Sequence, residues 1–162
     1  MGRFRRLHET MVERRVLAID FGMKRFGLAV SDALGLTAQG LQTIERSNVN
    51  RDLSTLEALV REYDAQEIII GNPLSKNGSP SAMSRRVEEF AQKLGKRVQC
   101  AVRLWDERLS SAEANRMLRS SGIGLIKRQR AVDRVAATLI LQGYLDWRAH
   151  CAQPVPLPFS TT

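Results

Sequence analysis

The fold class of this chain is decided by residues 16–30, which read VLAIDFGMKRFGLAV. The apolar run over 16–19 is typical of a strand buried on both faces of a sheet. Asp20 ends that run, and Gly22 lies where the chain is expected to turn. Because apolar residues resume over 26–30, the stretch predicts two antiparallel strands joined as a hairpin.

Strand-like and helix-like patterns alternate along the rest of the chain. They predict strands over 38–44, 67–70 and 98–104, and helices over 51–63, 80–94, 110–118 and 131–147. Helical crossovers join parallel strands, whereas the hairpin is antiparallel. We therefore expect an α/β fold with a mixed five-stranded sheet, an N-terminal antiparallel hairpin and flanking helices.

Several boundaries carry specific expectations. Ser79 and Pro80 have the order of a helix N-cap and a first helical residue, and Gly95 suits the C-terminal cap of the same helix. The helix over 131–147 is apolar nearly all round in its middle, so we expect it to be buried. The preceding stretch, 120–130, is expected to be a flexible loop.

Length and composition fit a single domain. Of the 162 residues, 43% are hydrophobic and 26% are charged, as in ordinary globular proteins. We expect the folded domain to occupy residues 15–150. The basic segment 1–14 and the Pro-containing segment 151–162 are expected to be flexible extensions.

Several classes of protein are disfavoured. No apolar run reaches the roughly 18 to 20 residues that span a bilayer, and the first residues lack the apolar stretch of a secretory signal, so we expect a cytoplasmic protein without a membrane segment. Cys100 and Cys151 lack metal-finger spacing and are expected to be reduced. His8 and His150 lie near the chain ends, which disfavours Ser-His-Asp and zinc chemistry.

The balance of charge points to a polyanionic partner. The formal net charge is +8 and the isoelectric point is near 10.3. Phosphates neutralised by Lys and Arg release counterions, which favours nucleic-acid binding. A solvated basic surface explains the same numbers equally well, so charge alone identifies no nucleic acid.

Acidic residues occur at three places that the predicted fold brings to one edge of the sheet. Asp20 ends a strand, where open sheets bind ligands, although Asp also commonly hydrogen-bonds its own turn there. Asp106 and Glu107 follow another strand, and an ion pair with Arg108 or a helix N-terminus would equally explain them. Asp133 is expected in the first turn of the last helix, where it would complement the helix dipole.

Together, Asp20, Glu107 and Asp133 could converge at one rim of the sheet. Hard cations such as Mg²⁺ or Mn²⁺ bind oxygen ligands and relieve the repulsion between clustered carboxylates. Two such ions about 4 Å apart can activate water and stabilise the leaving oxygen of a phosphodiester. The basic residues that could then hold phosphates are Lys24, Arg25, Arg108, Lys127, Arg128 and Arg130.

Four motifs occur in a characteristic order: DFGMKRFGLAVSD at 20–32, IGNP at 70–73, DERLS at 106–110, and Asp133 followed by Ala136-Ala137 and Ile140-Leu141-Gln142. In this order and spacing they resemble the YqgF (RuvX) family over nearly the whole chain. The resemblance implies an RNase H-like fold and a Holliday-junction-resolvase-like nuclease that matures the 5′ end of pre-16S rRNA. Carried over position by position, it makes Asp20, Glu107 and Asp133 the catalytic and metal-binding acids.

Other functions compete with a metal-dependent ribonuclease. A junction-specific DNA endonuclease acting on structured DNA would share the fold but would require a dimer, since it needs two active sites. A non-catalytic nucleic-acid-binding module would use the acids for structure alone. An actin-like ATPase would need a second copy of the fold, for which the chain has no room. The sequence leaves open whether the chain is a monomer or a weak homodimer, and whether Asp106 also binds metal.

Overall fold

The computed structural model describes residues 14–75, 77–106 and 124–152. The elements in chain order are β1 (Arg15–Phe21), β2 (Arg25–Ser31), β3 (Ala38–Glu45), α1 (Val49–Glu62), β4 (Ala65–Asn72), α2 (Ala82–Arg97), β5 (Ala101–Asp106) and α4 (Leu125–Ala152). The helix expected over 110–118 and most of both terminal extensions lie outside the described residues. None of the described helices is long and apolar enough to cross a membrane.

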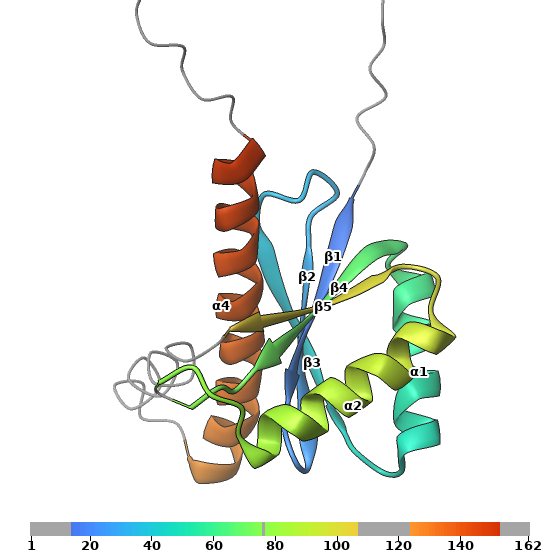
Figure 1. Cartoon of the computed structure of the whole chain (residues 1–162), viewed down its shortest axis with the longest axis vertical. Helices are drawn as coiled ribbons and strands as arrows, with labels where there is room; N and C mark the ends of the chain where they lie inside the picture. Colours follow the sequence, from blue (N-terminus) through green and yellow to red (C-terminus); the bar gives the residue numbers. More distant parts are fainter. Residues whose placement is uncertain (1–13, 76, 107–123, 153–162) are drawn as a thin grey trace, which may run out of the picture.

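The five strands form one mixed sheet with the order β3-β2-β1-β4-β5 (Figure 1). β2 runs antiparallel to both β1 and β3. β4 is parallel to β1, and β5 is parallel to β4. The predicted α/β fold with a mixed five-stranded sheet and an N-terminal hairpin is therefore confirmed.

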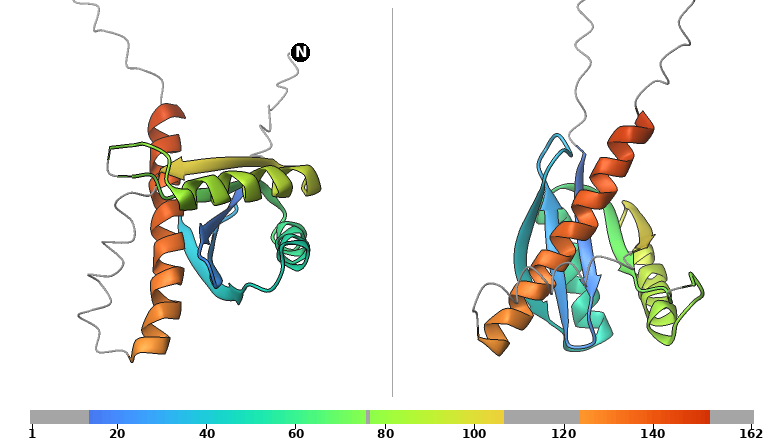
Figure 2. Two further views of the ribbon diagram at one scale, coloured as in Figure 1. Left: turned by 60° about the horizontal axis from the view of Figure 1, so that its bottom comes forward. Right: turned by 90° about the vertical axis from the view of Figure 1, so that its left-hand side faces the viewer.

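Helices cover the two faces of this sheet unequally. α4 lies across one face, whereas α1 and α2 lie on the other (Figure 2). β1 is the central strand, and residues 16–19 are fully buried because alternate side chains enter the core on each face. Leu17 and Ile19 pack toward α1 and α2, and Val16 and Ala18 pack toward α4. Burial on both faces explains the unbroken apolar run from which the strand was predicted.

The predicted boundaries of α2 were wrong at both ends. Its N-cap is Ser81, whose Oγ accepts a hydrogen bond from the Ser84 backbone N–H, while Ser84 Oγ accepts one from the Ser81 N–H. This reciprocal capping box starts the helix at Ala82 rather than at Pro80. At the other end the helix continues through Gly95 to Arg97 and is capped by Val98. β5 consequently begins at Ala101 instead of the expected residue 98.

The expected start of α4 was also wrong. The helix begins at Leu125, so residues 125–130 are helical although the sequence predicted a loop there. The expected burial of this helix is confirmed on the face that packs on the sheet. Ile140 and Leu141 are fully buried on that face, whereas Trp147 is 51% exposed.

Close packing of α4 requires a glycine in β2. A Cβ on Gly27 would overlap the backbone carbonyl of Asp133, which cannot swing aside as a side chain could. Because protein interiors tolerate little overpacking, we expect Gly27→Ala to lower the free energy of unfolding by about 2 to 3 kcal/mol in urea titrations.

The matched control is Gly95→Ala in α2. A Cβ there meets only Val102 Cγ2, at an ordinary 3.9 Å. Ala has the higher helix propensity, so this variant should gain about 0.5 to 1 kcal/mol. Equal stability of the two variants would contradict the close packing of α4 on β2.

Candidate nuclease site

The site is built around Asp20, the penultimate residue of β1. Asp20 pairs with Gly27 in the antiparallel register of β1 and β2. Side chains directly opposite one another on neighbouring strands point to the same face of the sheet. Since the Cβ direction of Gly27 meets Asp133, Asp20 also projects toward α4 and the Asp133 segment. Asp20 and Asp133 thus lie on the same face of the sheet.

Asp133 lies well inside α4, eight residues after the helix begins at Leu125. Its expected place in a first turn was therefore wrong, and so is an explanation by the helix dipole, which acts only over the first turn. Asp133 Oδ2 accepts a hydrogen bond from Arg25 Nε at 3.1 Å. The two side chains are 16% and 22% exposed, so this is a partly buried, charge-assisted ion pair.

Basic residues of β2, of the turn before it and of α4 accompany this pair. Arg25 is the register partner of Glu45 on β3, and Arg130 of α4 forms an ion pair with Glu45 at 3.1 Å. Lys24 precedes Arg25 and is exposed, as is Lys127 in the first turn of α4. Among the predicted basic residues, Arg25 lies on β2, Lys24 lies in the turn before it, and Lys127 and Arg130 lie on α4. The side chain of Arg128 and the whole of Glu107 and Arg108 lie outside the described residues.

Asp106, the other described acid at a strand end, is the last residue of β5 and is exposed. Trp105 packs on the core beneath α4, while Val102 packs on the opposite core. Strand alternation therefore directs Asp106 to the α2 face, away from the face of Asp20.

Asp32, an acid in the first motif, has a structural role. Its Oδ1 accepts backbone N–H bonds from Leu36 at 2.7 Å and Thr37 at 3.1 Å. The hydrogen bonds from Thr37 and Leu36 lower the pKa of Asp32 because they stabilise its charged form. Asp32 thus closes the turn that follows β2.

Sequence reasoning missed Arg46, which fixes the β1–β2 turn. One of its terminal nitrogens donates to the Gly22 carbonyl at 3.1 Å, and its Nε pairs with Asp52 at 3.2 Å. Its guanidinium lies 4.5 Å from the Phe21 ring centroid. No local pattern marks this role, because the contact with Gly22 joins positions 24 residues apart.

The ligands that this candidate site offers to a metal ion are carboxylate oxygens. Within the described residues, no group of three His, Cys, Asp or Glu side chains is arranged to hold a metal ion. Asp20 and Asp133 nevertheless supply carboxylates from one face of the sheet, and carboxylate oxygen is the ligand that Mg²⁺ and Mn²⁺ prefer. The donor chemistry therefore fits a hard divalent cation.

A second polar cluster on the same face has a different character. Glu67 accepts a hydrogen bond from the Tyr144 hydroxyl at 2.7 Å and pairs with Arg103 and with Arg148 at 3.5 Å. Burial and the hydrogen bond to Glu67 raise the pKa of Tyr144 to about 12. Both charges of Arg103 and Arg148 are thus engaged by one carboxylate, which indicates a structural cluster.

This pKa predicts how stability depends on pH. The raised pKa favours the neutral phenol in the folded state, so its contribution is complete below the ordinary pKa of about 10 and is lost as pH rises toward 12. We expect the wild type to lose more stability than Tyr144→Phe over this window, measured by urea unfolding. Parallel pH profiles for the two proteins would contradict the assignment.

Solved structures with a related architecture identify the fold class. T. thermophilus RuvC in complex with a Holliday junction substrate has a TM-score of 0.50 and 17% identity, covering 88% of this chain and 99% of that chain. Fowlpox virus resolvase with Holliday junction DNA has a TM-score of 0.53 and 9% identity, covering 83% and 98%. Identities this low show the fold alone, which is RNase H-like.

The family follows from sequence. The model of the RuvX family, described as Holliday junction resolvase, matches residues 14–147, and the chain belongs to this family. A Koribacter versatilis protein named "Putative pre-16S rRNA nuclease" is 48% identical over 137 residues, 85% of this chain and 90% of the relative. A Halalkalibacterium halodurans protein of the same name is 46% identical over 134 residues, 82% and 96%. The chain is thus a nuclease that hydrolyses phosphodiester bonds of nucleic acid.

Proposed function

We propose that this protein is a metal-dependent ribonuclease that processes the 5′ end of pre-16S rRNA in the cytoplasm. The observation that carries the proposal is the convergence of Asp20 and Asp133 on one face of the sheet. The names of its relatives support the choice of RNA. The catalytic domain comprises residues 15–150, with 1–14 and 151–162 as extensions outside the reaction centre.

Three carboxylates, Asp20, Glu107 and Asp133, hold Mg²⁺ or Mn²⁺ in this proposal. Asp20 and Asp133 rest on the geometry above, and Glu107 rests on the family motif that it occupies. Such ions supply Lewis-acid activation of water and stabilisation of the leaving oxygen. Asp20 lies on the strand β1 and Asp133 lies on the helix α4, and regular elements hold side chains more precisely than loops do.

The basic residues bind and orient the substrate. Arg25 is placed to donate to a phosphate next to Asp133, and its planar guanidinium suits two-pronged phosphate contacts. The remaining phosphate-binding residues of the proposal are Lys24, Arg108, Lys127, Arg128 and Arg130. They neutralise the backbone on either side of the scissile bond and so position it for in-line attack.

A pair of isosteric substitutions tests the carboxylates. We expect Asp20→Asn to reduce Mn²⁺-dependent cleavage of pre-16S rRNA by at least about 100-fold, because an amide is a poor ligand for a hard cation. Asp32→Asn is the matched control, since an Asn Oδ1 can accept the same two N–H bonds in its turn. Cleavage is measured on gels with purified protein, with and without EDTA. Cleavage by Asp20→Asn at the wild-type rate would refute the proposed site.

Arg25 provides an independent test, because it competes with a cation for the Asp133 carboxylate. We expect Arg25→Gln to bind Mn²⁺ at least as tightly as the wild type in calorimetry. Its affinity for RNA in EDTA should fall about 5-fold at 0.1 M salt, the effect of one lost phosphate contact. Weaker Mn²⁺ binding would instead mean that Arg25 orients Asp133 for the ion.

A junction-specific DNA endonuclease is the second candidate, favoured by the description of the matching family model. It requires two sites related by a dyad, whereas the ribonuclease functions as a monomer or weak homodimer. The oligomeric state, measured by sedimentation with and without four-way DNA, distinguishes these two candidate functions. A stable dimer that cleaves four-way junctions in preference to single-stranded RNA would establish the second candidate.

A further inference from the structure

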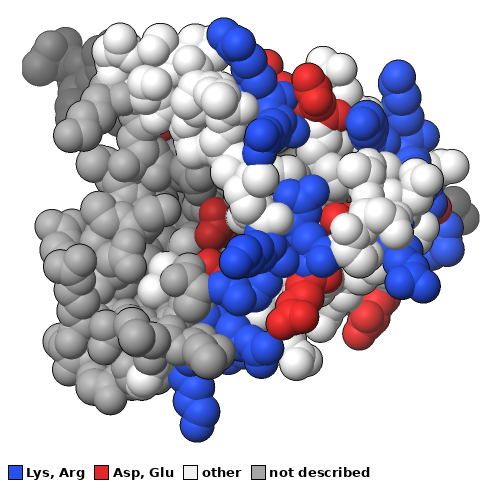
Figure 3. All heavy atoms as spheres, turned by 90° about the horizontal axis from the view of Figure 1, so that it is seen from below, with Lys and Arg blue, Asp and Glu red and all other residues white. Residues whose placement is uncertain are grey.

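Three hollows adjoin one another beside the β1–β2 turn, α1 and α2. Lys and Arg side chains gather on the face seen from below (Figure 3). The first lies beside the β1–β2 turn, the second lies between that turn and α2, and the third lies between α1 and the end of α2. Val49 lines all three, so the hollows adjoin one another at this residue. We call the three hollows together the basic groove. It starts at Arg25, and its further basic side chains are Lys24, Arg46, Arg86, Lys93, Lys96 and Arg97.

The charge of the basic groove is strongly one-sided. The acids that line it are Glu45 and Glu89, and Glu45 is already paired with Arg130. Within the described part of the chain, no ion pair involves Lys93 or Lys96. A polyanion would therefore meet positive charge that other side chains do not neutralise.

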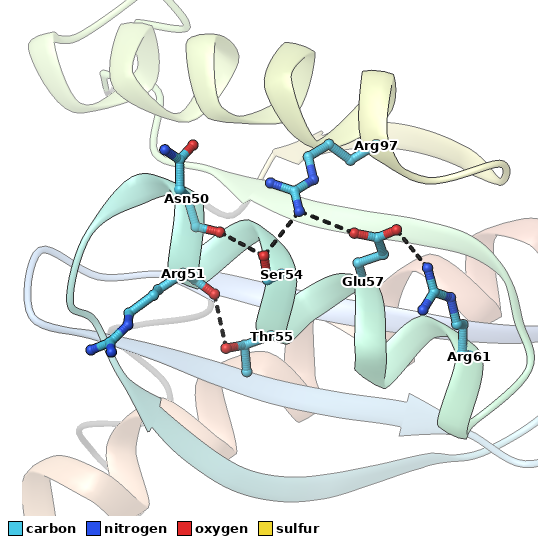
Figure 4. A network of polar contacts seen from close by, with 7 residues as sticks. All are labelled: Asn50, Arg51, Ser54, Thr55, Glu57, Arg61 and Arg97. Atoms are coloured by element: carbon cyan, nitrogen blue, oxygen red, sulfur yellow. Dashed lines mark hydrogen bonds and ion pairs between the residues drawn. The ribbon is translucent and has the colours of Figure 1, made fainter.

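Polar contacts fix the walls of the groove. At its far end, Arg97 of α2 donates to Ser54 Oγ at 2.9 Å and to Glu57 Oε2 at 3.2 Å, both on α1 (Figure 4). Near its start, Arg46 ties the β1–β2 turn to Asp52. These arginines are therefore engaged in holding the elements together, and the lysines between them remain as the charges for a ligand.

The shape and lining select the class of ligand. The aromatic residues along the groove, Phe21 and Phe90, are only 8% and 4% exposed, so the groove offers no platform on which bases could stack. Contacts must then be made to the phosphate backbone. The three hollows adjoin one another at Val49, and a flexible single strand can adapt its backbone to contact them in turn.

We propose that the basic groove binds the phosphate backbone of single-stranded RNA leading away from the cleavage site. The groove begins at Arg25, whose Nε lies 3.1 Å from the Asp133 carboxylate, so a strand in the groove passes directly into the proposed site. This inference rests on the proposed function. It adds Lys93 and Lys96 on α2, which lie outside the four sequence motifs, as residues that bind substrate without taking part in the reaction.

The test compares two variants that each remove two positive charges. The groove variant is Lys93→Gln with Lys96→Gln, and the control is Arg14→Gln with Arg61→Gln, both exposed and outside the groove. Binding of a fluorescent single-stranded RNA and of its duplex is measured by anisotropy in EDTA. Circular dichroism checks that both variants fold.

We expect the groove variant to bind single-stranded RNA about 25-fold more weakly at 0.1 M salt, with the salt slope reduced by about 1.4, the values for two lost phosphate contacts. The control should bind as the wild type does. Equal loss in both variants, or no loss in the groove variant, would overturn the proposal, and equal loss for duplex RNA would overturn the choice of a single strand. The assay measures binding in EDTA, where no metal-dependent cleavage takes place. These outcomes are therefore independent of whether Asp20→Asn abolishes activity.

Discussion

The contact between α4 and β2 at Gly27 is the constraint on which the candidate site depends. No side chain separates the Gly27 backbone from the Asp133 carbonyl, and Gly27 pairs directly with Asp20. The two acids therefore approach each other because a glycine lets a helix come close to a sheet. A larger residue at this position would move α4 outward and separate the acids, even with both still present in the sequence.

Elements whose sequence pattern is set by local burial were predictable. The apolar run 16–19 has to be a central strand, since both of its faces are covered. The start of α4 was not predictable in the same way, because residues 125–130 are mainly basic and polar and lack the apolar spacing of a buried helix. Their inclusion moves Asp133 from a helix end to a helix interior, where the dipole offers no reason for an acid.

The sequence identified the candidate acids of the site, but it did not identify the side chains that contact them. Asp20 and Asp133 were found from strand ends, clustering and motif order, all of which are visible in sequence. The pairing of Arg25 with Asp133 joins positions 108 residues apart, and that of Arg46 with Gly22 joins positions 24 apart. Neither contact has a local signature, since each is created by the way the sheet and helices come together.

Electrostatics explains why such arginines accompany the acids. Carboxylates on one face of a sheet repel each other, and a partly buried acid is costly without a partner. Arg25 meets this need at Asp133 from the strand that neighbours Asp20, so the compensating charge arrives with the same packing that creates the cluster. The same arginine is where the basic groove begins. A single cation thus both stabilises the acidic cluster and stands where a phosphate backbone would enter it, which couples the stability of the site to the binding of its polyanionic substrate.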